Sequence, residues 1–154
     1  MKRLALLALL LPSIVMAEAL TWLKKDNPND LFIIAYASPT CSMTDEKLKS
    51  VVKGVLVRSR ITPAPTRDLN GANLEVFLYC MMLDSGNSPV FNLDIQFKKI
   101  VGPNDDGEYV RLSTNRNYGT LGIGDSDFMV QAIKNATENA ITVYLESNFD
   151  PGDD

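Results

Sequence analysis

Two apolar segments of strand length, separated by a helical pattern, constrain the fold of this 154-residue chain more than any other feature. Residues 31–38 and 73–83 are apolar on both alternating faces, which favours strands that are covered on both sides. Between them, apolar residues recur at helical spacing from Leu48 to Leu56. A strand, a helix and a strand in this order predict two parallel strands joined by a right-handed crossover.

The ends of this helix can be predicted from its flanking residues. Ser42 or Thr44 is expected to cap its start, because a hydroxyl can accept from the free backbone N–H groups of the first turn. The helix is expected to end near Arg58, because Pro63 and Pro65 follow shortly after.

The second half of the chain predicts two more strands. Residues 91–97 alternate between apolar and polar side chains, and residues 108–118 form a weaker strand pattern. Turn-forming residues at 84–89 and 102–107 separate these strands. The glycine-rich residues 119–124 are expected to be irregular.

A long helix is expected to close the chain. Asp125 or Ser126 can cap its start, and it is expected to end near Asn148. Its buried stripe is expected to contain Phe128, Met129, Ala132, Ile133, Ala136, Ala140, Ile141, Tyr144 and Leu145.

The expected fold class is α+β, with elements in the order β-α-β-β-β-α. The simplest packing is a two-layer sandwich, in which a four-stranded mixed sheet carries both helices on one face. We expect one domain over residues 18–150, after a leader at residues 1–17 and before an acidic tail at residues 151–154.

The N-terminal residues have the pattern of a secretory signal peptide. Lys2 and Arg3 precede an apolar stretch, and Ala17 provides a small residue for cleavage. The alternative is an uncleaved anchor, but the apolar run has only about twelve residues, whereas a membrane-spanning helix needs roughly 20. We therefore expect cleavage after Ala17 and, because the basic start is short as in bacterial leaders, a periplasmic protein.

Composition and charge limit the kinds of partner that the chain can be expected to bind. Apolar residues make up 45% of the chain, as in globular proteins. The net charge is −4, and loss of Lys2 and Arg3 with the leader makes it −6. An acidic protein has no electrostatic attraction to nucleic acid or to anionic lipid, so neither is an expected partner.

The two cysteines, Cys41 and Cys80, are expected to form a disulfide, because an exported chain matures in an oxidising compartment. They follow or lie near the C-terminal ends of the two predicted parallel strands, so their Cα atoms can come within about 7 Å. Two free thiols are the alternative.

The absence of histidine removes the common catalytic and metal-binding arrangements. Ser-His-Asp triads, Cys-His dyads and histidine metal sites are all excluded. Calcium at Asp125 and Asp127 or near Asp105, and phosphate at residues 119–124, are weaker hypotheses than ordinary loops and helix caps. We expect no cofactor, no metal and no enzymatic activity.

Arginine and tyrosine mark a possible interaction surface. If the arginines converge, their guanidinium groups can bind a carboxylate or an acidic partner, and otherwise they are scattered surface charge. The candidate residues are Arg58, Arg60, Arg67, Arg111, Arg116 and Tyr118. Met81 and Met82 are expected to fill the core instead.

These observations favour an exported, non-catalytic binding or accessory protein that contacts another envelope protein. The expected contact region is residues 116–125 with the exposed edge of the sheet. Two alternatives remain at this point: a binder of a small anionic ligand with an arginine-lined pocket, and a hydrolase that uses carboxylates.

Overall fold

A computed structural model describes most of the chain after residue 20. The expected leader and acidic tail lie outside the described residues. Those residues are 21–69, 71–82, 89–103, 109–114 and 117–149.

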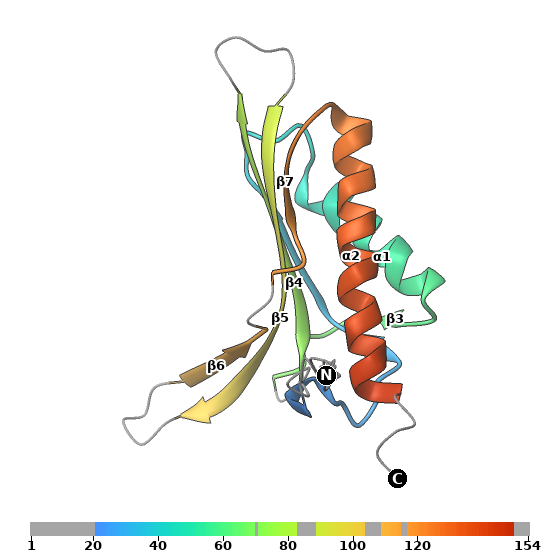
Figure 1. The fold of residues 1–154 in the computed structure, drawn as a ribbon. Helices are drawn as coiled ribbons and strands as arrows, with labels where there is room; N and C mark the ends of the chain where they lie inside the picture. Colours follow the sequence, from blue (N-terminus) through green and yellow to red (C-terminus); the bar gives the residue numbers. More distant parts are fainter. Residues whose placement is uncertain (1–20, 70, 83–88, 104–108, 115–116, 150–154) are drawn as a thin grey trace, which may run out of the picture.

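The described residues form a five-stranded sheet and two long helices, with a short helix and a small two-stranded sheet beside them (Figure 1). In chain order, the elements are η1 (Thr21–Leu23), β1 (Asp30–Leu31), β2 (Ile33–Ala37), α1 (Asp45–Arg58), β3 (Thr62–Pro63), β4 (Asn73–Met82), β5 (Pro89–Pro103), β6 (Tyr109–Ser113), β7 (Thr120–Ile123) and α2 (Ser126–Phe149).

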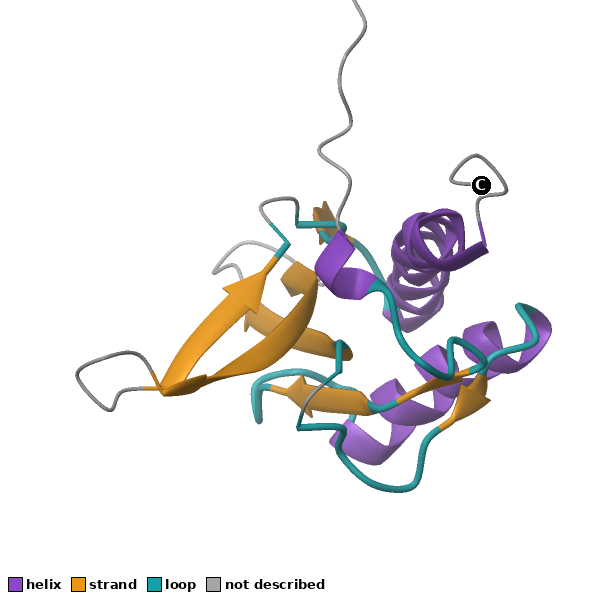
Figure 2. Cartoon of the chain, turned by 90° about the horizontal axis from the view of Figure 1, so that it is seen from below, coloured by secondary structure: helices purple, strands orange, loops and turns teal. Residues whose placement is uncertain are grey.

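The α+β class predicted from the sequence is confirmed. The main sheet runs β2-β4-β5-β6, and β2 pairs with β4 in parallel while β4, β5 and β6 pair antiparallel. Seen from below, both helices lie on the same side of this sheet (Figure 2). The small sheet consists of β1 and β3, which also pair in parallel.

The sheet has five strands rather than the four expected. Residues 120–123, predicted to be irregular, form β7 and pair with Val90–Leu93 at the start of β5. Because β6 pairs only with the later part of β5, the backbone groups of the earlier part would be unpaired on that side without β7. Satisfying these groups outweighs the low strand preference of a glycine-rich segment.

The core lies between the sheet and the helices. Leu74, Val76 and Leu78 of β4 and Phe91, Leu93, Ile95 and Phe97 of β5 are buried on this side. The facing residues of the helices are also buried, as the helical spacing predicts. They include Leu48, Val52, Val55 and Leu56 of α1, and Met129, Ile133, Ala140, Ile141 and Tyr144 of α2.

Both helices begin with the capping interactions expected from the sequence. Thr44 caps α1 by accepting a hydrogen bond from the backbone N–H of Lys47, and Asp125 accepts one from the N–H of Phe128 at 2.9 Å. The end of α1 is a Schellman turn, in which Arg60 has a left-handed φ of 61°.

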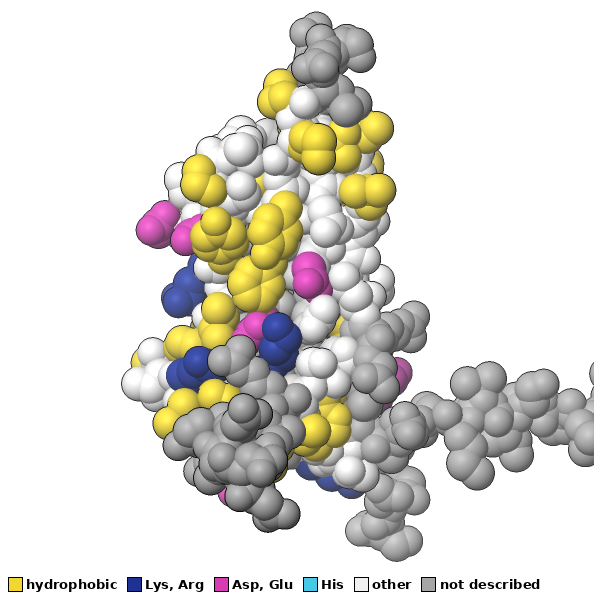
Figure 3. Space-filling model, turned by 90° about the vertical axis from the view of Figure 1, so that its left-hand side faces the viewer, with side chains coloured by type: hydrophobic (Ala, Val, Ile, Leu, Met, Phe, Trp, Pro, Cys, Tyr) yellow, Lys and Arg dark blue, Asp and Glu magenta, His cyan; other side chains and the backbone are white. Residues whose placement is uncertain are grey.

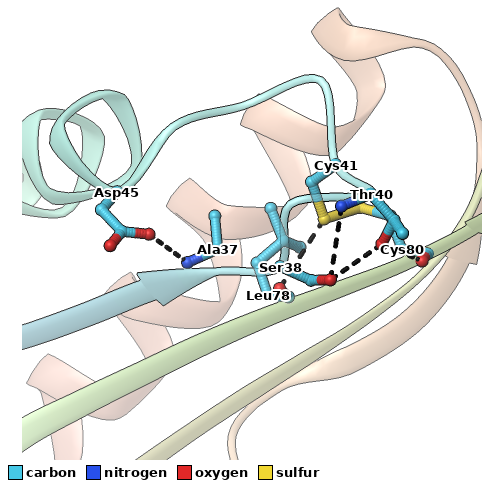
Figure 4. Close-up of a disulfide and its surroundings, with 7 residues drawn as sticks. All are labelled: Ala37, Ser38, Thr40, Cys41, Asp45, Leu78 and Cys80. Carbon is cyan, nitrogen blue, oxygen red and sulfur yellow. Dashed lines mark hydrogen bonds between the residues drawn. A yellow bond between two sulfur atoms is a disulfide. The ribbon is translucent and has the colours of Figure 1, made fainter.

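The predicted disulfide is confirmed. Cys41 and Cys80 are bonded, with Cα atoms 5.0 Å apart (Figure 4). The hydroxyl of Thr40 also donates to the carbonyl oxygen of Cys80 at 2.6 Å. The backbone N–H of Ser38 donates to the carbonyl oxygen of Leu78 at 2.8 Å. The residues that follow β2 are therefore fixed to β4 by a covalent bond and by hydrogen bonds.

Tyr144 anchors the C-terminal half of α2 to the start of the fold. Its ring is buried, and its hydroxyl lies 3.0 Å from the carbonyl oxygen of Pro28 and 3.3 Å from that of Asp30. Burial, with smaller contributions from the charges of Asp30 and Asp68, raises the pKa of Tyr144 well above its ordinary value.

Removing the disulfide should lower the free energy of unfolding by about 3–4 kcal/mol, because the bridge closes a loop of roughly 40 residues in the unfolded chain. Urea denaturation of the oxidised protein and of the double variant Cys41→Ala, Cys80→Ala measures this difference. A reductant should destabilise the wild-type protein and leave the double variant unchanged. Equal stability of the oxidised and reduced forms would contradict the prediction.

The raised pKa of Tyr144 predicts a loss of stability at alkaline pH. The unfolded tyrosine ionises above about pH 10 while the buried one stays protonated, so its contribution is complete below that pH and is lost as pH rises. Tyr144→Phe should reduce the decline by up to about 1.4 kcal/mol per pH unit. Urea unfolding across this range provides the measurement, and an unchanged slope in the variant would refute the assignment.

Candidate functional site

The face of the sheet opposite the helices, here called the open face, carries the largest group of exposed apolar side chains that the described residues present. Strand register shows which residues share this face, because residues directly opposite one another point to the same side. Tyr36 is opposite Phe77, and Met81 and Ile123 are both opposite Val90. Figure 3 shows apolar side chains gathered over the centre of this face.

Three aromatic rings form the centre of the open face. The ring centroids of Tyr36, Phe77 and Tyr79 lie 6.2–6.5 Å from one another. Tyr36 is 40% exposed and Tyr79 is 46% exposed. Rings at this spacing support one another while keeping one side of the cluster in contact with solvent.

Longer apolar side chains extend the aromatic cluster toward β7. Met81 is 65% exposed, Leu121 is 71% exposed and Ile123 is 61% exposed. The name apolar patch is used below for the whole group of Tyr36, Phe77, Tyr79, Met81, Leu121 and Ile123. The prediction that Met81 and Met82 fill the core is wrong: both are exposed, and Met81 points to the face that has no helix.

Charged residues lie at one end of the apolar patch. Glu75 is nearly buried and pairs with Lys98 at 2.9 Å, while Arg67 lies 3.9 Å from the same carboxylate. The ammonium group of Lys98 also lies 5.6 Å from the centroid of the Phe77 ring. Because these charges are paired with one another, they give the patch a polar boundary rather than a strongly charged one.

The structure does not gather the described arginines into one site. Arg58 pairs with Glu138 of α2 at 3.2 Å, whereas Arg67 pairs with Glu75, whose side chain points to the open face. Arg58 and Arg67 therefore lie on opposite sides of the sheet. Arg60 lies in the turn after α1.

The three other residues of the predicted interaction surface are Arg111, Arg116 and Tyr118. Arg111 lies in β6, but its side chain is outside the described part of the structure, as is the whole of Arg116. Tyr118 is only 8% exposed, and its ring packs edge-on against Phe97 with the centroids 6.2 Å apart. Its position in the core explains why it does not provide the exposed contact that the sequence suggested.

A hollow, here called the β7–α2 groove, lies on the helix side of the sheet. It has a volume of about 400 Å³ and is bounded by residues 118–122 and by Phe128, Gln131, Asn135 and Asn139 of α2. None of its lining residues is charged. Phe128, predicted to be buried, is 53% exposed beside this groove.

The described residues do not place three or more cysteine or carboxylate side chains where they could hold a metal ion together. Asp125, one of the possible calcium ligands, accepts the capping hydrogen bond of α2 instead. Asp105 lies outside the described residues. No helix in the described part of the chain is long and apolar enough to cross a membrane.

The sequence contains the apolar pattern of the open face, but this pattern also fits strands covered on both sides. Residues 31–38 are apolar on both alternating faces, and the pattern predicted cover on both sides. That expectation is wrong, because the described residues place no second layer over the open face, where Tyr36 is exposed. Apolar side chains on an uncovered face give the same sequence pattern as a strand between two layers.

The chain matches no known protein-family profile, and no curated protein sequence is significantly similar to it. Among solved structures, it is similar to a minor lipoprotein from Acinetobacter baumannii, with 10% sequence identity and a TM-score of 0.33. The similarity covers 77% of this chain and 92% of that one. At this level of identity and TM-score, the similarity supports no inference about this chain.

Substitution of Gly119 tests the close approach that shapes the β7–α2 groove. A Cβ atom there would lie 1.8 Å from the backbone carbonyl oxygen of Leu93, so Gly119→Ala should lower stability by about 1–3 kcal/mol. Gly102→Ala is the matched control, because nothing lies within 4 Å of its added Cβ. Thermal or urea unfolding measures both variants, and similar stabilities would show that β7 can move away from β5 at little cost.

Proposed function

We propose that this chain is an exported, non-catalytic accessory protein that binds another envelope protein through its open face. The observation that carries the proposal is the apolar patch, in which Tyr36, Tyr79 and Met81 are 40–65% exposed. Large contiguous apolar patches are uncommon on proteins that act alone, and they commonly mark contact surfaces.

The composition of the patch suits a protein interface. Tyrosine and other aromatic residues contribute strongly to binding, because they bury a large area at a small cost in side-chain entropy. Fully burying one large apolar side chain is worth roughly 1.5–3 kcal/mol. Several such contacts can offset an association cost of about 4–15 kcal/mol, so the patch is large enough to support binding.

Other features support the two remaining parts of the proposal, which are export and the lack of catalysis. The leader pattern at residues 1–17 and the Cys41–Cys80 disulfide both fit a protein that matures outside the cytoplasm. The complete absence of histidine fits a binding role better than acid–base or nucleophilic catalysis.

Neither alternative function gains support from a specific observation. Arg58 and Arg67 lie on opposite sides of the sheet, and the β7–α2 groove has no basic residue with which to attract an anion. The same groove also has no carboxylate that could act as an acid or a base.

Site-specific photocrosslinking in intact cells tests the proposed surface. A photoreactive phenylalanine analogue at Tyr79 should give a covalent adduct of defined mass with another envelope protein. The same analogue at Lys53, an exposed residue of α1 on the other side of the molecule, is the matched control and should not give this adduct. Adding Met81→Asp should weaken the Tyr79 adduct, because binding would then require burial of an unpaired charge.

Two outcomes would count against this surface, and a third would count against a different protein as its partner. The same adduct from Tyr79 and Lys53 would show that capture does not depend on the open face. An adduct that is unaffected by Met81→Asp would show that the apolar patch does not contribute to binding. An adduct with twice the mass of the chain would identify the partner as a second copy instead of a different protein.

A further inference from the structure

We infer that the β7–α2 groove is a second binding site, which takes an uncharged, extended segment of a partner polypeptide as an added strand on β7. This site lies on the helix side of the sheet, whereas the apolar patch lies on the open face. Leu121 belongs both to the groove lining and to the apolar patch, but the two sites share no other residue. Variants at positions other than Leu121 therefore let either site fail without the other.

The backbone of β7 leaves hydrogen-bonding groups available along its outer edge. Tyr118 and Gly124 donate their backbone N–H groups to β5 at 3.0 and 3.3 Å, so the even-numbered positions of the strand bond to β5. The N–H and C=O groups of Leu121 and Ile123 consequently point away from β5. Among the described residues, β5 is the only strand that pairs with β7.

An unpaired edge of this kind is a template for strand addition. An extended peptide beside it can donate to and accept from the backbone, as in other cases of β-augmentation. The carbonyl oxygen of Leu121 also lies 3.3 Å from the hydroxyl of Thr120, which leaves its second lone pair for a peptide N–H. The edge therefore provides main-chain affinity with little dependence on the peptide sequence.

The helix side of the groove provides a regular row of amides. Gln131, Asn135 and Asn139 follow one another at intervals of four residues and are exposed. Such residues are about 6 Å apart along a helix axis, close to the repeat of about 6.8 Å between alternate residues of an extended strand. Gln131 donates to the amide oxygen of Asn135 at 2.7 Å. Each amide has further donors and acceptors, with which the row can contact successive side chains of a peptide lying beside β7.

The lining of the groove indicates which peptide side chains fit. No lining residue is charged, so a charged peptide side chain would lose its hydration without gaining a partner. Phe91 and Phe128 contribute rings whose centroids are 6.0 Å apart, and Gly122 has no Cβ atom to cover them. We expect the bound segment to be uncharged and to place one apolar side chain against Phe128.

A display library of short random peptides tests this inference with the purified, oxidised protein. Enriched peptides should be uncharged and rich in β-branched residues. Leu121→Pro should weaken their binding by roughly tenfold or more, because it removes an outward N–H without breaking a bond to β5. Leu121→Ala keeps this N–H and is the matched control, with binding expected within about twofold of the wild type.

A second pair of variants keeps the test independent of any change in strand geometry. Asn135→Lys places a charge in the groove from an exposed helix position and should also weaken peptide binding by roughly tenfold. Glu146→Lys, on the same helix but outside the groove, should have no effect. Met81→Asp should leave peptide binding unchanged, which separates this site from the open face.

Several results would overturn the inference. These are a library that yields no enriched peptide, enriched peptides with a recurrent charge, and peptides that bind equally to Leu121→Pro and to the wild type. Sedimentation equilibrium gives a further check: a wild-type dimer that Leu121→Pro converts to a monomer, but that Leu121→Ala and Met81→Asp do not, would show that the edge is covered by a second copy of the chain. The inferred partner segment would then be wrong.

Discussion

The fold depends on the parallel pairing of β2 with β4, which the Cys41–Cys80 bond holds at one end. Parallel strands require a crossover, and the right-handed crossover places α1 on one face of the sheet. Helix α2 packs beside α1 on that same face, so the two helices share one core (Figure 2). Within the described part of the chain, the opposite face keeps its apolar side chains without a second layer, and this asymmetry is the origin of the open face.

Local patterns predicted most of the elements. The helical spacing and the capping residues Thr44 and Asp125 place both helices close to their observed bounds. The predicted parallel strands also placed the two cysteines close enough to bond, as they do in the structure. β7 could not be predicted in this way. Its strand conformation comes from pairing with the part of β5 that β6 does not reach, and the intrinsic preferences of its glycine-rich sequence do not favour it.

The candidate sites were harder to predict from the sequence than the fold. A strand with apolar residues on both faces can lie between two layers or present one face to a partner, and the residues of β2 and β4 fit both cases. The buried position of Tyr118 and the separation of Arg58 from Arg67 depend on how distant segments pack. The spacing of residues along the chain does not show which distant side chains come together. It shows only which side chains are apolar and which are charged.

The disulfide also links the stability of the domain to the place where it matures. Cytosolic thiols are kept reduced, so a newly made chain in that compartment would lack the covalent link between β2 and β4. If the chain is exported as proposed, the reduced precursor would unfold more readily and could pass through a narrow translocation channel. Oxidation on the far side would make the process effectively one-way, because the cross-linked domain resists being unfolded again.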